Sequence, residues 1–181
     1  MAQRGRDAGP WDASEADRAA GDHIDLGGLR IPSSQGLKLR PVYGRRGDEV
    51  EAVGIVSGRT ALQLQAFRAA EGRPWNRIRG ELLAKLIAGR GEAKEWAGPA
   101  GVEIRSNQPV TKSDGSRGVM AVRFLGCDGP GWLLRGVVTG EGAAPDSTDQ
   151  WAFETFMNTI VDPTCPGGSS IELKRPQSGW S

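Results

Sequence analysis

The chain has 181 residues, a length that suits one domain with a single hydrophobic core. Its 23 Lys and Arg residues nearly balance 22 Asp and Glu residues, so the basic excess typical of a dedicated nucleic-acid binder is missing. No apolar run approaches the roughly 20 residues of a membrane-spanning helix, and the N-terminus has no apolar signal-peptide core. We therefore expect a cytoplasmic protein with no membrane contact, for which nucleic acid is an unfavoured partner.

Residues 1–23 form a polar, Ala-rich and charged arm. Such a segment buries too little apolar surface to offset the entropy lost on ordering, so we expect it to be mostly flexible. Trp11 is the exception, because a lone Trp in a polar arm can dock onto the neighbouring domain. We expect a single ordered domain over residues 24–163. The segment 164–181 is rich in Pro, Gly and Ser and is predicted to be a flexible tail.

Seven segments bounded by Gly-, Pro- and Asp-rich turns are predicted to be β-strands. In residues 60–67, for example, leucines alternate with Gln63 and Gln65, the pattern of a strand with two different faces. A shorter apolar run at residues 29–31 precedes them. The predicted strands span residues 37–43, 49–56, 60–67, 92–96, 102–108, 118–126 and 132–139.

Two helices complete the predicted elements. The first begins at Pro74, which suits a first helical turn, and ends at the glycines of residues 89–91. Its apolar stripe has helical spacing and consists of Trp75, Ile78, Leu82 and Leu86. The second is predicted over residues 148–161, with a capping box from Ser147 to Gln150. Neither helix lies in a repeated βαβ unit, which indicates an α+β fold: an antiparallel twisted sheet of about seven or eight strands, with both helices packed on one face.

Residues suited to catalysis or metal binding are scarce. His23 is the only histidine, and its place in the predicted arm is poor for a precise catalytic role. Cys127 and Cys165 are too few and too far apart for a zinc site; they could form a disulfide, but we expect free thiols, as is usual in the cytoplasm. No glycine cluster has the spacing of a phosphate-binding loop. We therefore assign no catalytic residue, no metal site and no cofactor.

The face of the sheet without helices is the predicted binding surface. Polar and charged side chains at alternating strand positions would lie on it among small and apolar ones: Gln63, Gln65, Glu103, Arg105, Arg123 and Arg135. Arg and Gln on such a face can hold a peptide or an acidic partner. The alternatives are a solvated face with cross-strand charge pairs, or a face covered by the arm through Trp11 or by a second subunit.

The leading hypothesis is therefore a non-enzymatic binding or adaptor domain that engages an unidentified protein partner through this open face and the arm with Trp11. One alternative is a small-molecule sensor or enzyme with a pocket between helix and sheet. Another is weak nucleic-acid binding through the basic residues of the first hairpin, which are Lys38, Arg40, Arg45 and Arg46.

Four blocks in order resemble the actinobacterial domain-of-unknown-function family 3710. They are Gly-Pro-Trp-Asp at 9–12, Asp-Leu-Gly-Gly-Leu-Arg-Ile-Pro at 25–32, Ala-Leu-Gln-Leu-Gln-Ala-Phe at 61–67 and Asp-Gly-Pro-Gly-Trp-Leu-Leu-Arg-Gly at 128–136. Trp75, Ile78 and Arg79 are similar to the start of the family's first helix. The resemblance covers residues 9–163 and implies no reaction, but it places Trp11 in a shared block and so favours docking of the arm. The element order resembles, more loosely, the Mog/PsbP-type fold, whose members are mostly binding or scaffolding proteins.

Overall fold

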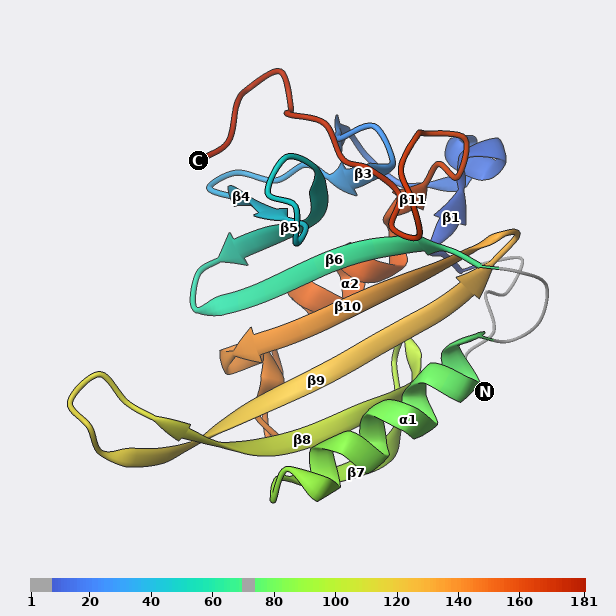
Figure 1. Cartoon of the computed structure of the whole chain (residues 1–181). Helices are drawn as coiled ribbons and strands as arrows, with labels where there is room; N and C mark the ends of the chain where they lie inside the picture. Colours follow the sequence, from blue (N-terminus) through green and yellow to red (C-terminus); the bar gives the residue numbers. More distant parts are fainter. Residues whose placement is uncertain (1–7, 70–73) are drawn as a thin grey trace.

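The main element of the fold is a twisted, antiparallel sheet of seven strands in the order β4-β5-β6-β10-β9-β8-β7 (Figure 1). This computed structural model describes residues 8–69 and 74–181. The seven strands are β4 (Lys38–Tyr43), β5 (Val50–Ser57), β6 (Thr60–Arg68), β7 (Glu92–Gly98), β8 (Gly101–Thr111), β9 (Arg117–Gly129) and β10 (Trp132–Gly140). The α+β class and the antiparallel sheet expected from the sequence are confirmed.

The hairpin of β8 and β9 is longer than its sequence pattern predicted and extends beyond the body of the domain (Figure 1). Its turn is closed by Asp114, whose side chain accepts hydrogen bonds from the Ser116 amide at 2.9 Å and the Ser116 hydroxyl at 2.6 Å. These hydrogen bonds lower the pKa of Asp114. Gly115 adopts the left-handed backbone, φ +81°, that the turn requires.

The two main helices, α1 (Pro74–Ala88) and α2 (Trp151–Met157), lie on opposite faces of this sheet. Trp75 of α1 occupies the space where a Cβ on Gly126 would stand, whereas Phe156 of α2 packs against Leu125 and Gly136. Leu125 and Gly126 are neighbours in β9 and therefore face opposite sides. Figure 1 shows α1 in front of the sheet and α2 behind it.

The prediction that both helices pack on one face is wrong in this respect. β9 is apolar on both sides, with Val122 buried on the α1 side and Leu125 and Cys127 buried on the α2 side. The sequence of β9 therefore gave no sign that one of its faces is exposed to solvent. Trp75 also bonds on the α1 side, donating from its indole to the Val102 carbonyl at 2.9 Å.

α2 is shorter than the helix predicted over residues 148–161. It is preceded by Asp149, whose carboxylate accepts the Trp151 amide at 3.0 Å, so the predicted capping box at Ser147 does not form. At its other end the Asn158 side chain bonds the backbone of Ala20, at 2.9 Å from the Ala20 amide. The following residues leave the helix and form strand β11 (Ile160–Val161).

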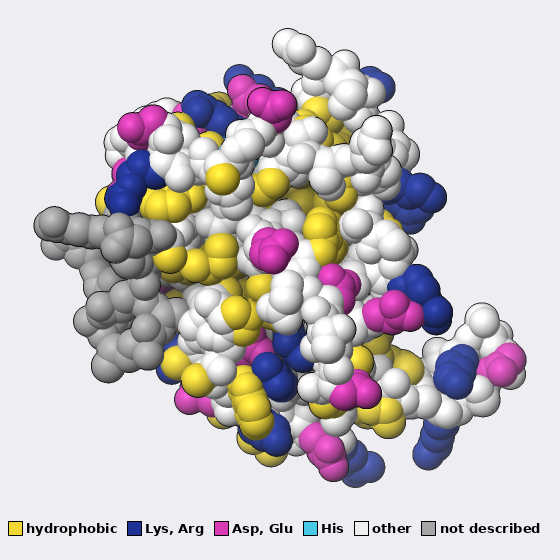
Figure 2. All heavy atoms as spheres, turned by 180° about the vertical axis from the view of Figure 1, so that it is seen from behind, with side chains coloured by type: hydrophobic (Ala, Val, Ile, Leu, Met, Phe, Trp, Pro, Cys, Tyr) yellow, Lys and Arg dark blue, Asp and Glu magenta, His cyan; other side chains and the backbone are white. Residues whose placement is uncertain are grey.

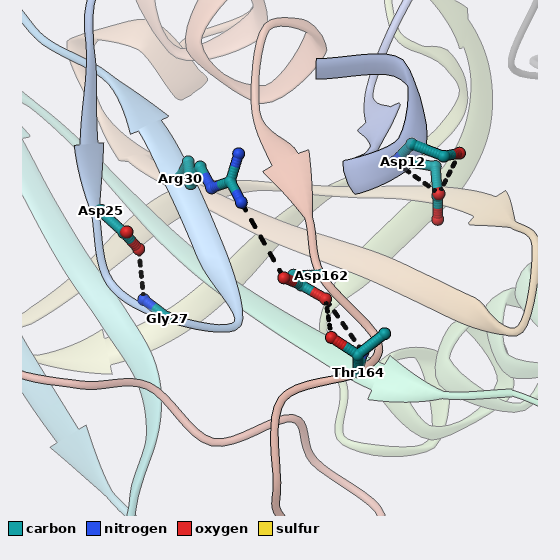
Figure 3. Close-up of polar contacts among 7 residues, drawn as sticks. Asp12, Asp25, Gly27, Arg30, Asp162 and Thr164 are labelled. Carbon is teal, nitrogen blue, oxygen red and sulfur yellow. Dashed lines mark hydrogen bonds and ion pairs between the residues drawn. The ribbon is translucent and has the colours of Figure 1, made fainter.

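A second, four-stranded sheet has the order β1-β11-β3-β2 and is built from β1 (Trp11–Asp12), β2 (His23–Asp25), β3 (Leu29–Pro32) and β11. β1 runs parallel to β11, with Trp11 beside Ile160. Around this sheet, Asp25 accepts the Gly27 amide at 2.8 Å, and Asp162 lies 3.9 Å from Arg30 (Figure 3).

The described part of the arm, from residue 8 onward, is therefore ordered, contrary to the predicted flexible segment 1–23. Trp11 is docked and only 7% exposed. Asp12 caps the 3-10 helix η1 (Ala13–Arg18) in a capping box with Glu15, and it also accepts the Trp132 indole at 2.8 Å. Asp12 thus joins the arm to the large sheet. Residues 1–7 lie outside the described residues.

The C-terminal segment is also part of the fold, so the prediction of a loose tail over 164–181 is wrong. Ile171 and Leu173 are buried, and their amides donate to the carbonyls of Ala66 and Val50, each at 2.9 Å. Pairing of β5 with β6 stops at Val53, and this segment takes the free backbone groups beyond that point. Two apolar residues at period two were the signal for it.

The hydrophobic core lies between the α2 side of the large sheet, α2 itself and the small sheet. Its largest fully buried side chains include Trp132 and Phe156. Cys127 and Cys165 are free thiols, and burial raises the pKa of Cys165. Within the described residues no helix is long and apolar enough to cross a membrane.

Candidate functional site

The strand register divides the six predicted face residues between the two sides of the large sheet. Arg135 lies opposite Gln65 and beside Gly126, so these side chains, and Gln63 two residues away, are on the α1 side. The other three share the α2 side with Leu125 by the same alternation, and they are Glu103, Arg105 and Arg123. The structure thus brings together two groups of three and does not place all six on one surface.

The group on the α1 side is held by its own contacts. The Arg135 guanidinium donates to the side-chain oxygen Oε1 of Gln65 at 2.8 Å and lies 5.1 Å from the centre of the Phe67 ring. Gln65 donates in turn to the Ser170 hydroxyl at 2.9 Å, so the C-terminal segment reaches this group. Burial lowers the pKa of Arg135. Among the described residues no helix crosses β6 and β10 on this side (Figure 1). Gln65 and Arg135 already have partners, whereas the Gln63 side chain makes no hydrogen bond to a described residue.

The group on the α2 side is a largely buried ion cluster. Glu103 is 1% exposed, with Arg105 Nε 2.7 Å and Arg123 Nη1 3.9 Å from its Oε1. Arg123 donates to the carbonyls of Ala143 and Ala144, at 3.3 and 2.8 Å. Burial, and then Arg105, lower the pKa of Arg123, while Glu103 opposes them. Arg123 therefore ties β9 to the short helix η2 (Glu141–Ala143) and is not available to a partner.

Beside this cluster a cavity of about 350 Å³ opens at the β7 end of the sheet. It lies between the strands β7 to β9 and the short helix η2. We call it the Trp96 pocket and define it by Glu92, Lys94, Trp96, Arg105, Asn107 and Ala143. Figure 2 shows this side of the molecule, where basic side chains lie among hydrophobic ones in the lower part of the view.

An exposed indole forms one wall of the Trp96 pocket. Trp96 is 44% exposed, an unusual state for so large an apolar group. The Arg105 guanidinium stands 4.4 Å and the Lys94 ammonium 5.2 Å from its ring centre. Both cations are therefore attracted to the face of the ring. They are also held close to each other, because Lys94 lies opposite Arg105 in the β7–β8 ladder.

The cations of the Trp96 pocket have unused donors. Lys94 has no carboxylate within ion-pair distance among the described residues, and Arg105 bonds Glu103 through Nε, leaving its terminal nitrogens unbonded there. The side-chain amide of Asn107 likewise makes no hydrogen bond to a described residue. Planar guanidinium and ammonium donors around an aromatic face suit a carboxylate or a phosphate. The pocket can therefore hold an anion next to a flat or apolar group.

The remaining candidates have structural partners. Trp11 packs in the core with the Arg18 guanidinium 4.8 Å from its ring centre. The His23 ring nitrogens face the carbonyl oxygens of Gly21 and Asn158, at 3.0 and 2.8 Å. His23 thus joins the arm to the end of α2. No group of three or more metal-binding side chains occurs in the described part of the chain.

The basic first hairpin shares its surface with carboxylates. Arg45 and Arg46 line a second cavity of about 430 Å³ together with Asp48, Glu49 and Glu51. Those acids neutralise the charge that would attract a phosphate backbone. Lys38 and Arg40 are exposed on β4.

Sequence reasoning found Arg105 but missed its pocket partners. Lys94 and Trp96 sit at alternate positions of a predicted strand, so their common side could have been recognised, and the turn after Gly98 places that strand beside Arg105. The η2 wall carried no such signal, because Ala143 reaches the pocket through the tertiary contact of Arg123.

Comparison with known proteins gives the family. No curated protein matches the chain. The family model described as "Protein of unknown function (DUF3710)" matches residues 9–179. The match begins in the docked arm and passes Pro163 to include the C-terminal segment that pairs with β5 and β6. Since it covers nearly the whole chain, the protein belongs to the DUF3710 family.

Proposed function

We propose that this chain is a non-enzymatic binding domain and that the Trp96 pocket holds the acidic part of a protein partner. The observation that carries the proposal is a pair of cations, Lys94 and Arg105, stacked on an exposed indole. Glu92 is the carboxylate on the same rim, and it makes no ion pair with a described residue. The proposed binding surface is thus the β7 end of the α2 side, which includes Arg105 from the six residues expected from the sequence.

The shape of the Trp96 pocket supports a protein partner over a small metabolite. A small-molecule site encloses about 70–90% of its ligand, whereas here Lys94 and Trp96 are exposed side chains on an edge strand. A half-exposed Trp next to Arg is typical of the residues that dominate protein interfaces. The two free thiols, Cys127 and Cys165, suit a reducing compartment, so we place the protein and its partner in the cytoplasm.

A second candidate is a sensor for a small anionic molecule. The volume of about 350 Å³ is large enough for one. Saturation of the Trp96 pocket by a simple aromatic carboxylate such as benzoate, together with no response to an acidic peptide, would favour this function.

The test uses a hexaglutamate peptide added to the full chain and the indole signals in ¹H–¹⁵N NMR spectra, with Trp96→Phe to assign the Trp96 signal. We expect hexaglutamate, but not hexalysine, to shift that signal. Lys94→Glu should weaken binding about fivefold or more, since it turns an attraction into a repulsion. The matched control is Lys112→Glu, which reverses an exposed charge at the distant β8–β9 turn and should leave affinity unchanged. An unshifted Trp96 signal at saturating peptide would sink the proposal.

A further inference from the structure

The outer edge of β7 has no strand beside it. β7 is last in the strand order, and Gly98 pairs with Gly101 across a two-residue turn. The antiparallel alternation then directs the backbone N–H and C=O groups of Ala93, Glu95 and Ala97 away from β8. Within residues 8–69 and 74–181 no backbone group pairs with them. β7 contains no proline and its pairing has no register shift, so its outward backbone groups remain available, and only its charged side chains, Lys94 among them, guard this edge.

On the α1 side of this edge, an apolar helix surface is left partly uncovered. Within α1, all of which the structure describes, Trp75 alone is buried. The later apolar residues of the stripe are half-buried, and Ile87 is 55% exposed. α1 packs on β7, β8 and β9 and runs along the β7 edge (Figure 1), where Arg79 bonds Glu95 at 2.7 Å. A strand added next to β7 would bring its own apolar side chains under this helix.

On the α2 side of the same edge lies the Trp96 pocket. Lys94 and Trp96 project to this side, and their cation and ring would meet the neighbouring side chains of an added strand. Successive residues of such a strand would therefore face different surroundings, basic on one side and apolar on the other.

We propose that β7 accepts an extended segment of the partner as an eighth strand of the large sheet, and that this segment alternates acidic and apolar residues. The inference rests on the proposed function and specifies its partner. Acidic side chains enter the Trp96 pocket, apolar ones pack beneath α1, and the partner backbone bonds the free groups of Ala93, Glu95 and Ala97. Main-chain hydrogen bonds supply affinity in this mode, and the alternating side chains supply specificity.

The charges of β7 favour a different chain over a second copy as the occupant. Full overlap of two β7 strands puts a two-fold axis through Glu95 and sets Glu95 against Glu95, and an axis through Lys94 sets Lys94 against Lys94. An axis through Trp96 avoids like charges but pairs only residues 94–98 of each strand. Like charges directly opposite each other destabilise a strand pair. The charges that attract an acidic segment thus oppose self-pairing.

The experiment compares two capped heptapeptides of the same composition, one alternating glutamate and valine and the other with the glutamates and valines in separate blocks. We expect the alternating peptide to bind the full chain about tenfold more tightly. On binding, the amide hydrogens of Ala93, Glu95 and Ala97 should exchange about tenfold more slowly or better. N-methylation of the alternating peptide at the nitrogens that face β7, which are every second one, should abolish its tighter binding.

A protein variant tests the same edge from the other side. Ala97→Pro removes an outward N–H and should lower affinity for the alternating peptide about tenfold, while Ala97→Ser keeps that N–H and serves as the matched control. An unchanged thermal melt shows that Ala97→Pro has folded; if it has not, the N-methylated peptide with the unaltered chain decides. Lys94→Glu should weaken the binding of both peptides.

Each outcome separates the two proposals. Equal binding of both peptides, weakened by Lys94→Glu but with no amide protection, overturns strand addition and leaves the anion pocket standing. A Trp96 signal that responds to neither peptide overturns both. Protection of the β7 amides that grows with the concentration of the free chain would show a second copy on this edge and overturn the choice of occupant.

Discussion

The two edges of the large sheet are treated differently. At β4, the Ser181 amide donates to the Leu39 carbonyl at 2.8 Å and the Ser181 hydroxyl accepts the Leu39 amide at 3.2 Å. The next outward position is Pro41, which has no N–H, and the pairing with β5 shifts after Val42. β7 has none of these devices. β4 is thus closed to a further strand by three means, whereas β7 keeps its outward backbone groups and has only charged side chains to guard it.

The largest expected effect concerns the ion cluster that supports the β7 end. Arg123→Ala should lower the free energy of unfolding by about 3–5 kcal/mol, because it leaves the buried Glu103 with Arg105 alone and frees the η2 carbonyls. Urea denaturation measures the loss. Arg117→Ala, an exposed residue of the same strand, is the control and should change stability by less than about 0.5 kcal/mol. A loss below about 1 kcal/mol for Arg123→Ala would mean that the cluster does not hold this end of the sheet.

The next effect concerns the segment that closes the sheet on the β4 side. Leu173→Ala should cost about 2–4 kcal/mol, since the side chain is 2% exposed and its removal leaves a cavity. The same denaturation experiment measures it, with the exposed Lys174→Ala as the neutral neighbour. Limited proteolysis should then cut the C-terminal segment of the Leu173 variant first. A variant as stable as the original chain would show that the segment contributes little to the fold.

A smaller effect is expected from a substitution that opens the β4 edge. Pro41→Thr restores an outward N–H on β4 and should change stability by less than about 1 kcal/mol. It should raise self-association, measured by sedimentation velocity at increasing concentration, because β4 then offers a free donor. Val42→Thr, whose backbone groups point to β5, should not. If the two variants associate equally, Pro41 does not protect the β4 edge.

The smallest effect concerns Arg90, in the turn between α1 and β7. Arg90 ends α1 with φ +64°, a left-handed conformation that disfavours side chains with a Cβ. Arg90→Gly should raise the free energy of unfolding by about 0.5–1 kcal/mol. In contrast, Arg77→Gly, in the exposed interior of α1, should lower it by about 1 kcal/mol. Thermal unfolding of both variants provides the check, and a destabilised Arg90→Gly would contradict the stated origin of the strain.

Local patterns were enough for the hairpins and not enough for long-range pairing. The strands of the large sheet and the start of α1 at Pro74 follow from alternation, helical spacing and turn residues. β1 and β11 have two residues each and no periodicity of their own, so only their pairing defines them. The helix faces were misplaced because β9 is apolar on both sides. The looser likeness to the Mog/PsbP-type fold stays a prediction.

The candidate site shows the same division. Arg105 was singled out from its strand position and does line the Trp96 pocket. Glu103 and Arg123 have the same alternating pattern as solvated charges, and nothing local shows that η2 and α2 bury them. Whether a partner uses the face with Gln63, Gln65 and Arg135 stays a prediction as well.

The parallel pair of β1 and β11 sets an order for synthesis. Trp11 leaves the ribosome early, yet the backbone that receives it, at Thr159 and Ile160, is made near the end. The large sheet is complete at Gly140, before α2 exists to cover its apolar face. Until residues 151–161 are made, the apolar side of the large sheet that α2 covers has no partner, and the N-terminal arm has no strand to pair with. Chaperones and proteases that bind exposed apolar surface would act in that interval, and docking of Trp11 would mark its close.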